Sequence, residues 1–246
     1  MQRYFLRLAY SGTNYHGWQI QQNAHTVQAE MEQKIGVLLN RQVSITGCGR
    51  TDAGVHASEF FAHFDIEELP FMKKDFLFKL NRFLPKDIVI YDLFKVNNDM
   101  HARFSAVLRT YKYYISQIKD PFNQQFSYFF NGLLHVEKMN KAASMLMQFD
   151  DFTSFSKLHT QTATNLCKVS QAQWDINENG KLVFTISADR FLRNMVRAVV
   201  GTLLEIGKEK MPPESIIDII KAKDRTQAGF SVPARGLFLE KVRYPV

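Results

Sequence analysis

The stretch VSITGCGRTDAGVHASEFFAHF, residues 43–64, decides how the first half of the chain folds. Residues 43–46 alternate apolar with polar side chains, and residues 60–64 are rich in aromatic side chains, so each segment predicts a strand. The residues between them, 49–57, then form a tight connection, because their glycines allow sharp turns and the close approach of a ligand. One carboxylate, Asp52, lies in this connection, and we expect it to be presented rather than buried.

Two interpretations of Asp52 follow from the residues alone. Asp-Ala-Gly is ordinary turn chemistry, since Asp caps its own turn and Gly supplies a positive φ. Arg50 would then form a surface ion pair that contributes little to stability. Alternatively, a fixed and oriented carboxylate acts as a nucleophile, a general base or a metal ligand. The stretch by itself leaves both interpretations open.

Outward from this stretch, both halves of the chain show a similar order of elements. The periodicity of the first half predicts strand 3–10, helix 26–39, strands 43–48 and 58–66, helix 73–83 and strand 88–96. That of the second half predicts strand 108–118, helix 136–148, strands 166–177 and 181–188, helices 191–206 and 214–222, and strand 236–242. We therefore expect an α+β fold of two lobes, 1–104 and 105–246, with a catalytic cleft between them. Each lobe is an antiparallel sheet with helices packed on one face, as in ferredoxin and the RNA-recognition motif.

Composition and charge narrow the class of protein. Of the 246 residues, 46% are hydrophobic and 22% charged, which is typical of a soluble globular protein. The formal net charge of +7 falls mostly in the second half and favours a polyanionic partner. No apolar run is long enough to span a membrane, and the N-terminus does not resemble a signal peptide. Cys48 and Cys167 stand alone and the histidines lack zinc-ligand spacing, so we expect a cytoplasmic protein without a metal.

Several motifs of nucleotide and cofactor chemistry are missing from the sequence. There is no GxxxxGK[ST] phosphate loop, no GxGxxG after a strand, no GxSxG elbow and no carboxylate cluster suited to two metals. Nucleotide hydrolysis, dehydrogenase chemistry and metallonuclease chemistry therefore lose support. A cofactor-free reaction on a polyanion remains.

Basic and aromatic side chains of the second half suit RNA. Residues 109–114, RTYKYY, alternate the two kinds on the expected strand, so that cations can meet phosphates while rings stack on unpaired bases. Tyrosine is also simply favourable on a half-buried strand. Arg190, Arg193 and Arg197 share one stripe of the expected helix 191–206. The first two fit an exposed basic face equally well, whereas Arg197, deeper in an apolar helix, needs a partner anion.

Two loops of the first half have a less regular pattern. Residues 15–22, YHGWQIQQ, combine aromatic rings and amides without periodicity, which fits either a functional loop or a loop tucked onto the core. Arg103, in HARFS at 101–105, lies at the expected boundary between the lobes. It lines the cleft there or is an ordinary surface arginine.

Six motifs occur together, in this order: YHGWQ (15–19), GRTDAGVHA (49–57), HARF (101–104), RTY (109–111), FLRNMVR (191–197) and PARGL (233–237). With this set the chain resembles the bacterial tRNA pseudouridine synthase A family over essentially its whole length. The nine-residue motif around Asp52 is highly specific to that family, and none of the six motifs departs from the family pattern.

The resemblance implies isomerisation of uridine to pseudouridine at positions 38, 39 and 40 of the tRNA anticodon stem-loop. It also implies a homodimer that uses neither a metal nor an organic cofactor. It assigns the catalytic nucleophile to Asp52, contact with the target base to Tyr111, and pairing with the aspartate to Arg197. We further expect Arg50 and Arg103 to bind the substrate.

The sequence leaves part of the chemistry open. Asp52 could attack C1′ of the ribose or C6 of the base, or remove the 2′ proton, and the target base has to leave its helical stack to be reached. The alternatives to this function are a non-catalytic RNA-binding module and a paralogous synthase with other target uridines. The first accounts for the charge and the tyrosines but gives no reason for a carboxylate flanked by glycines.

Overall fold

The structure, a computed structural model, describes residues 1–157 and 164–245. It has an α+β fold with mostly antiparallel strands, which confirms the expected fold class. The chain forms two compact units, which we call the N-terminal unit (Met1–Val107 with Leu239–Val246) and the C-terminal unit (Leu108–Phe238). The final residues thus group with the first half of the chain and not, as the order of elements predicts, with the second.

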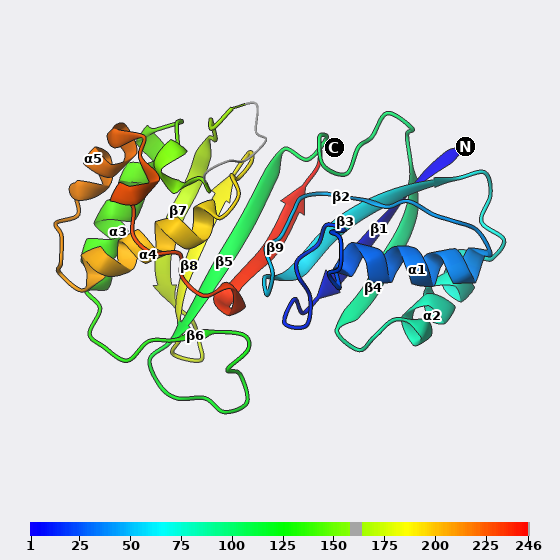
Figure 1. The fold of residues 1–246 in the computed structure, drawn as a ribbon, viewed down its shortest axis with the longest axis horizontal. Coiled ribbons are helices and arrows are strands. Elements are labelled where there is room, and N and C mark those ends of the chain that lie inside the picture. Colours follow the sequence, from blue (N-terminus) through cyan, green and yellow to red (C-terminus); the bar gives the residue numbers. More distant parts are fainter. Residues whose placement is uncertain (158–163, 246) are drawn as a thin grey trace. The chain divides into compact units, whose positions relative to one another are not determined.

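The N-terminal unit is a sheet of long antiparallel strands with two helices against it (Figure 1). Its elements are β1 (Gln2–Tyr10), α1 (Val27–Leu39), β2 (Thr46–Gly47), β3 (His56–Ile66), α2 (Lys73–Phe83), β4 (Ile88–Val96) and the end of β9 (Leu237–Arg243). β1 lies between β3 and β4, so that Phe5 is opposite both His63 and Phe94. Alternate residues of β1 and β3 face opposite sides of the sheet, because side chains alternate along a strand.

Local chemistry explains where α1 begins and ends. The side chain of Thr26 accepts a hydrogen bond from the amide of Ala29, and Asn40 adopts the left-handed conformation that ends a helix. Between them the buried residues Val27, Met31, Ile35 and Leu39 recur at helical spacing. The predicted helices 26–39 and 73–83 and the strand 88–96 are confirmed.

The C-terminal unit repeats the theme of an antiparallel sheet with helices (Figure 1). Its elements are β5 (Leu108–Ser116), β6 (Tyr128–Phe129), α3 (Val136–Met145), β7 (Val169–Ile176), β8 (Leu182–Ala188), α4 (Met195–Gly207) and α5 (Ser215–Ala222). β8 pairs antiparallel with both β5 and β7, while the short β6 runs parallel to β5. Trp174, Tyr113 and Phe184 are among the largest fully buried side chains.

Several element boundaries differ from the prediction, and three of the differences are the most informative. α4 begins at Met195 rather than at 191, because Asn194 adopts a left-handed conformation with φ 68° and its side chain donates to Ser231 Oγ. Arg190 and Arg193 therefore precede the helix, and the expected stripe of three arginines does not form. The strand predicted at 43–48 is only the two residues of β2, and the helix predicted to 148 changes to a 3-10 turn after Met145.

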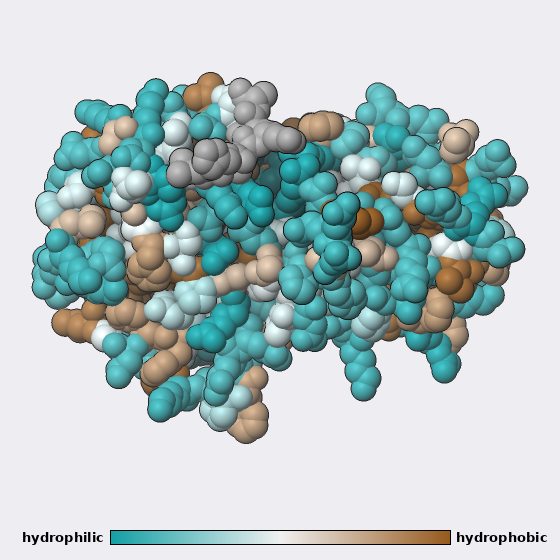
Figure 2. All heavy atoms as spheres, in the orientation of Figure 1, coloured by the Kyte–Doolittle hydropathy of each residue, from teal (hydrophilic) through white to brown (hydrophobic). Residues whose placement is uncertain are grey.

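The outer surface is mainly polar. Figure 2 shows hydrophilic residues over most of the visible face, with hydrophobic residues in small groups between them. Large apolar side chains that remain exposed include Phe78, Phe104 and Phe122. Isolated exposed side chains of this kind are normal in globular proteins, so each needs a second observation before it suggests a function.

Candidate active site

Asp52 lies in a hydrogen-bonded turn between β2 and β3. The amide of Val55 donates to the Asp52 carbonyl at 3.1 Å, and Gly54 takes the positive φ of 77° that this turn needs. The neighbouring Thr51 is buried, and its Oγ1 lies 2.8 Å from the hydroxyl of Tyr10 on β1. Asp52 itself is only half-buried. The carboxylate is thus presented from a turn that is anchored to the sheet on its N-terminal side.

The loop of residues 15–18 holds this turn from one direction. The Trp18 amide donates to the Thr51 carbonyl at 3.2 Å, and the Gly54 amide donates to the Tyr15 carbonyl at 3.2 Å. Gly17 has φ +91°, and a Cβ placed on it would lie 2.3 Å from the Thr51 carbonyl oxygen. Only glycine allows the two loops to approach this closely.

Aromatic contacts in turn fix the loop of residues 15–18. Trp18 is buried and stacks on Phe60 of β3 with ring centroids 4.1 Å apart, while the Tyr15 hydroxyl donates to Asp87 Oδ1 at 2.7 Å. Of the two interpretations of YHGWQIQQ, the tucked loop is therefore confirmed for Tyr15 and Trp18. The loop has a functional consequence all the same, because it sets the position of the backbone that carries Asp52.

A second pair of contacts holds the turn on its C-terminal side. The Gly12 amide donates to His56 Nδ1 at 3.1 Å, and a Cβ on Gly12 would lie 2.0 Å from the Val55 carbonyl oxygen. His56 is buried at the start of β3. The backbone on both sides of Asp52 is therefore packed against the segment that follows β1. Such bracing pre-organises a reactive group, since it leaves little freedom to be lost when a substrate binds.

Sequence reasoning identified Asp52 but missed the residues that brace it. Gly12 and Gly17 carry no reactive group and His56 is buried, so their bracing role is revealed only when the two segments are seen in contact. Two signals were available: the glycine of YHGWQ, which lies between two aromatic residues in a stretch without periodicity, and the place of His56 within GRTDAGVHA (49–57).

The two arginines of the N-terminal unit that we expect to bind the substrate are both exposed. Arg50 lies two residues before Asp52, on the surface of the same connection. Arg103 lies in the turn that follows β4, with its guanidinium carbon 5.4 Å from the centre of the Phe104 ring.

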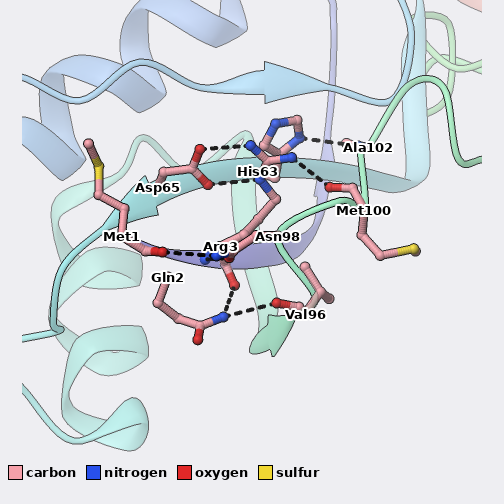
Figure 3. Close-up of polar contacts among 9 residues, drawn as sticks. All are labelled: Met1, Gln2, Arg3, His63, Asp65, Val96, Asn98, Met100 and Ala102. Atoms are coloured by element: carbon pink, nitrogen blue, oxygen red, sulfur yellow. Dashed lines mark hydrogen bonds and ion pairs between the residues drawn. The ribbon is translucent and has the colours of Figure 1, made fainter.

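The sheet of the N-terminal unit holds the backbone of this turn (Figure 3). Arg3 of β1 donates from Nη1 to the Met100 carbonyl at 2.8 Å, and His63 Nδ1 of β3 accepts from the Ala102 amide at 3.1 Å. The turn that carries Arg103 is therefore fixed by β1 and β3.

Tyr111 and Arg197 belong to the C-terminal unit. Tyr111 is half-buried on β5 opposite Ile186, and its ring meets that of Phe191 edge-on, with centroids 5.1 Å apart. Arg197 lies in the first turn of α4, where its Nε donates to the Val232 carbonyl at 2.7 Å. A guanidinium in an apolar helix needs a partner, and the Val232 carbonyl is one partner of this group.

The segment 228–233, which we call the strap, holds Arg197 in place. Its Gly229 amide donates to Thr202 Oγ1, and its Val232 amide donates to the Arg197 carbonyl. A Cβ on Gly201 would lie 1.7 Å from the Phe230 carbonyl oxygen, so glycine is what allows the strap to lie against α4. Arg197 is therefore positioned from both its own helix and the strap.

The described part of the chain contains no cluster suited to a metal ion, and its two cysteines are buried. Within residues 1–157 and 164–245, no three His, Cys, Asp or Glu side chains gather in a way that could hold a metal ion. Cys48 and Cys167 are buried, and burial raises the pKa of the Cys167 thiol to about 12, so this thiol stays protonated at neutral pH. Among the same residues, no helix is both long and apolar enough to cross a membrane.

Comparison with known proteins places this arrangement in a family. The sequence profile described as tRNA pseudouridine synthase matches residues 8–105 and 142–245. The chain belongs to the tRNA pseudouridine synthase family. Members of this family are isomerases that convert uridine to pseudouridine in tRNA. The matched ranges include Asp52 and Arg197, whereas Tyr111 lies outside them.

Full-length relatives agree with the profile. The chain is 51% identical to the tRNA pseudouridine synthase A of Bacteroides fragilis, over 100% of this chain and 97% of that protein. It is 53% identical to the protein of the same name from Bacteroides thetaiotaomicron, over 100% and 91%. The tRNA pseudouridine synthase A of Clostridium acetobutylicum is 40% identical, over 97% and 98%.

Proposed function

We propose that this chain isomerises uridine to pseudouridine at positions 38, 39 and 40 of the tRNA anticodon stem-loop, with Asp52 as the nucleophile. The observation that carries the proposal is the braced turn that presents Asp52. Hydrogen bonds and two closely packed glycines hold its backbone from both sides, which is more than a surface turn requires. Family membership supplies the reaction class.

The reaction replaces one glycosidic bond by another. The bond from C1′ to N1 of uracil breaks, the base turns, and a bond from C1′ to C5 forms while C5 loses its proton and N1 gains one. Both fragments have to stay in the site between these steps. A half-buried carboxylate on a fixed backbone suits this chemistry, because it can attack or deprotonate without first being ordered.

The remaining roles are assigned to residues that the fold holds firmly. We propose that Tyr111 contacts the detached base and that Arg197 pairs with Asp52 during the reaction. Their support is the geometry of the C-terminal unit, where Phe191 flanks the Tyr111 ring and the strap holds Arg197. Arg50 and Arg103 are exposed and would meet the negatively charged tRNA. We also propose that the enzyme is a cytoplasmic homodimer and needs neither metal nor organic cofactor.

The decisive test is the release of tritium from tRNA labelled at C5 of uridine. Asp52→Asn keeps the size of the side chain but removes its charge, and it should lower turnover by at least about 10³-fold while leaving tRNA binding nearly unchanged. Asp175→Asn is a matched control, because Asp175 is an exposed carboxylate on β7. This control should keep full turnover.

Each alternative gives a different result in the same experiment. Unchanged turnover in Asp52→Asn would eliminate Asp52 as the nucleophile. Binding of tRNA by the wild-type chain without any tritium release would favour a non-catalytic RNA-binding module. Mapping of the modified positions in the product tRNA would reveal a synthase with other target uridines.

A further inference from the structure

One guanidinium holds the first part of the strap. Arg225 opens the 3-10 turn Arg225–Gln227, which follows α5. Its Nη1 donates to the carbonyls of Ala228 and Gly229 at 3.2 and 3.1 Å, and its Nη2 donates to the Ser231 hydroxyl oxygen at 2.9 Å. We call these three hydrogen bonds the Arg225 fork. Because its acceptors are spread over four consecutive positions, the fork fixes the curve of the strap backbone.

The charge of Arg225 makes the fork a firm connection. Burial lowers the pKa of this guanidinium, but an arginine remains charged at neutral pH. None of the carboxylates in residues 1–157 and 164–245 forms an ion pair with it, so its acceptors are the neutral oxygens of the strap. Hydrogen bonds from a charged donor are stronger than neutral ones, and a partly buried charge that loses an acceptor is left unsatisfied. The guanidinium and the strap therefore hold each other in one arrangement.

The backbone that carries Arg225 is anchored to the same unit. Asp224 caps the 3-10 turn, since its side chain accepts from the Thr226 amide at 2.9 Å. The Asp224 amide donates to Ser154 Oγ at 3.0 Å, and this buried hydroxyl donates to the Ile219 carbonyl of α5 at 2.6 Å. The fork thus extends from a fixed point of the C-terminal unit.

The strap residues at and after the fork contact the start of α4. Ser231 Oγ, which accepts from Arg225, also accepts from Nδ2 of Asn194, the residue before α4, at 2.6 Å. The next residue, Val232, offers the carbonyl that accepts from Arg197 Nε at 2.7 Å. A shift of Ser231 would therefore move the oxygen that orients the Arg197 guanidinium.

We propose that Arg225 is a positioning residue for the isomerisation. Its fork holds the strap so that the Val232 carbonyl keeps Arg197 in the orientation from which it pairs with Asp52. The inference rests on the proposed function and adds a residue that acts through the backbone of the strap, without itself contacting the substrate. The effect on the reaction comes from order, because a guanidinium on a long side chain costs less to use when its supporting residues already fix it.

The rate of the chemical step tests this role. Arg225→Ala should lower the single-turnover rate constant of tritium release by roughly 10- to 100-fold, because a catalytic group displaced by about 1 Å loses that much. Affinity for unmodified tRNA transcript should change little, since an interaction made during the reaction affects turnover and not binding. Lys221→Ala is the charge control, because it removes one exposed cation of the neighbouring α5. This control should leave both the rate constant and the affinity unchanged.

Stability needs a control of its own, because Arg225→Ala removes three hydrogen bonds. Asn140→Ala removes two hydrogen bonds of the same unit, those that join α3 to the amide and carbonyl of Trp174 on β7 at 2.7 and 3.0 Å. It should lower the free energy of unfolding in urea and still release tritium at the wild-type rate. Ser231→Ala removes one acceptor of the fork and should slow release in the same direction as Arg225→Ala.

Three results would overturn the positioning role. They are a wild-type rate constant in folded Arg225→Ala, an equal loss of rate in Asn140→Ala, and a loss in Arg225→Ala that is confined to affinity. Should Arg225→Ala fail to fold, Ser231→Ala decides, and a wild-type rate constant there would overturn the role as well.

Arg197→Ala separates this inference from the proposed function. Absence of release by the wild-type chain would refute the reaction, and a wild-type rate constant in Arg197→Ala would refute the pairing of Arg197 with Asp52. A slow Arg197→Ala beside a normal Arg225→Ala would refute only the positioning role. We expect both variants to be slow while both bind the transcript.

Discussion

Gly17 lies outside the motif that contains the catalytic candidate, yet the structure makes it a residue on which that motif depends. We predict that Gly17→Ala disturbs the turn of Asp52 from a distance. A Cβ at position 17 would lie 2.3 Å from the Thr51 carbonyl oxygen, 3.2 Å from the Asp52 carbonyl carbon and 3.3 Å from the Ala53 amide nitrogen. All three atoms are backbone, so no side chain can turn aside to relieve the overlap.

The magnitude follows from two costs. Alanine at φ +91° is in a region that L-residues avoid, which costs about 1–3 kcal/mol, and overpacking against backbone adds a similar amount. We expect the free energy of unfolding of the N-terminal unit to fall by about 3 kcal/mol in total. The Thr51 carbonyl would also have to move by roughly 1 Å, and a displacement of that size at a catalytic group lowers turnover by about 100-fold.

The assay combines unfolding with tritium release. The chain has two tryptophans, one in each unit, so the Trp174→Phe background leaves Trp18 as the fluorescent reporter of the N-terminal unit during urea unfolding. Gly49→Ala is the control, because a Cβ there meets no heavy atom within 4 Å even though Gly49 belongs to the motif itself. Its stability should change by no more than about 0.5 kcal/mol. Full stability and turnover in Gly17→Ala, or equal damage in Gly49→Ala, would refute the reasoning.

Two other predictions use the same kind of geometry. Gly201→Ala raises the intrinsic helix propensity of α4, but its Cβ would lie 1.7 Å from the Phe230 carbonyl oxygen. We therefore expect the free energy of unfolding of the C-terminal unit to fall by about 3 kcal/mol. Urea unfolding followed through Trp174 fluorescence in a Trp18→Phe background measures this change. A gain in stability would show that the strap moves away from α4 without cost. His63 is buried, and its pKa falls from 6.5 to about 4 on folding, so the unfolded chain binds a proton at a higher pH than the folded one. The free energy of unfolding should therefore fall by up to about 3 kcal/mol as the pH falls from 6.5 towards 4. Urea unfolding at a series of pH values should show this pH-dependent loss in the wild type and not in His63→Gln.

Elements with a strong local pattern could be predicted from the sequence. The helix at 73–83 and the strand at 88–96 match the structure residue for residue, because the spacing of their apolar side chains and the proline at 85 act over short distances. The start of α4 could not be found in this way. It depends on Asn194, whose left-handed conformation accompanies a hydrogen bond to Ser231, 37 residues further along the chain.

The candidate site shows the same division. Asp52 could be selected from the sequence because a lone carboxylate between glycines is a local feature, and its motif is specific to the family. The chemical types of Tyr111 and Arg197, a stacking ring and a cation, could be recognised too. The sequence contained no comparable signal for Gly12, since a glycine in a turn most often has a structural role. His56 lies within the same motif as Asp52, but nothing in the sequence indicates that it contacts the segment after β1.

By itself, therefore, the sequence determined that the chain is an α+β protein with a presented carboxylate and a basic, aromatic second half. Only the folded chain shows that the segment after β1 braces Asp52, that the strap holds Arg197, and that β1 and β3 fix the turn of residues 100–105. The reason is physical. Periodicity and turn chemistry act between residues a few positions apart, whereas these braces are hydrogen bonds and close contacts between segments separated by tens of residues.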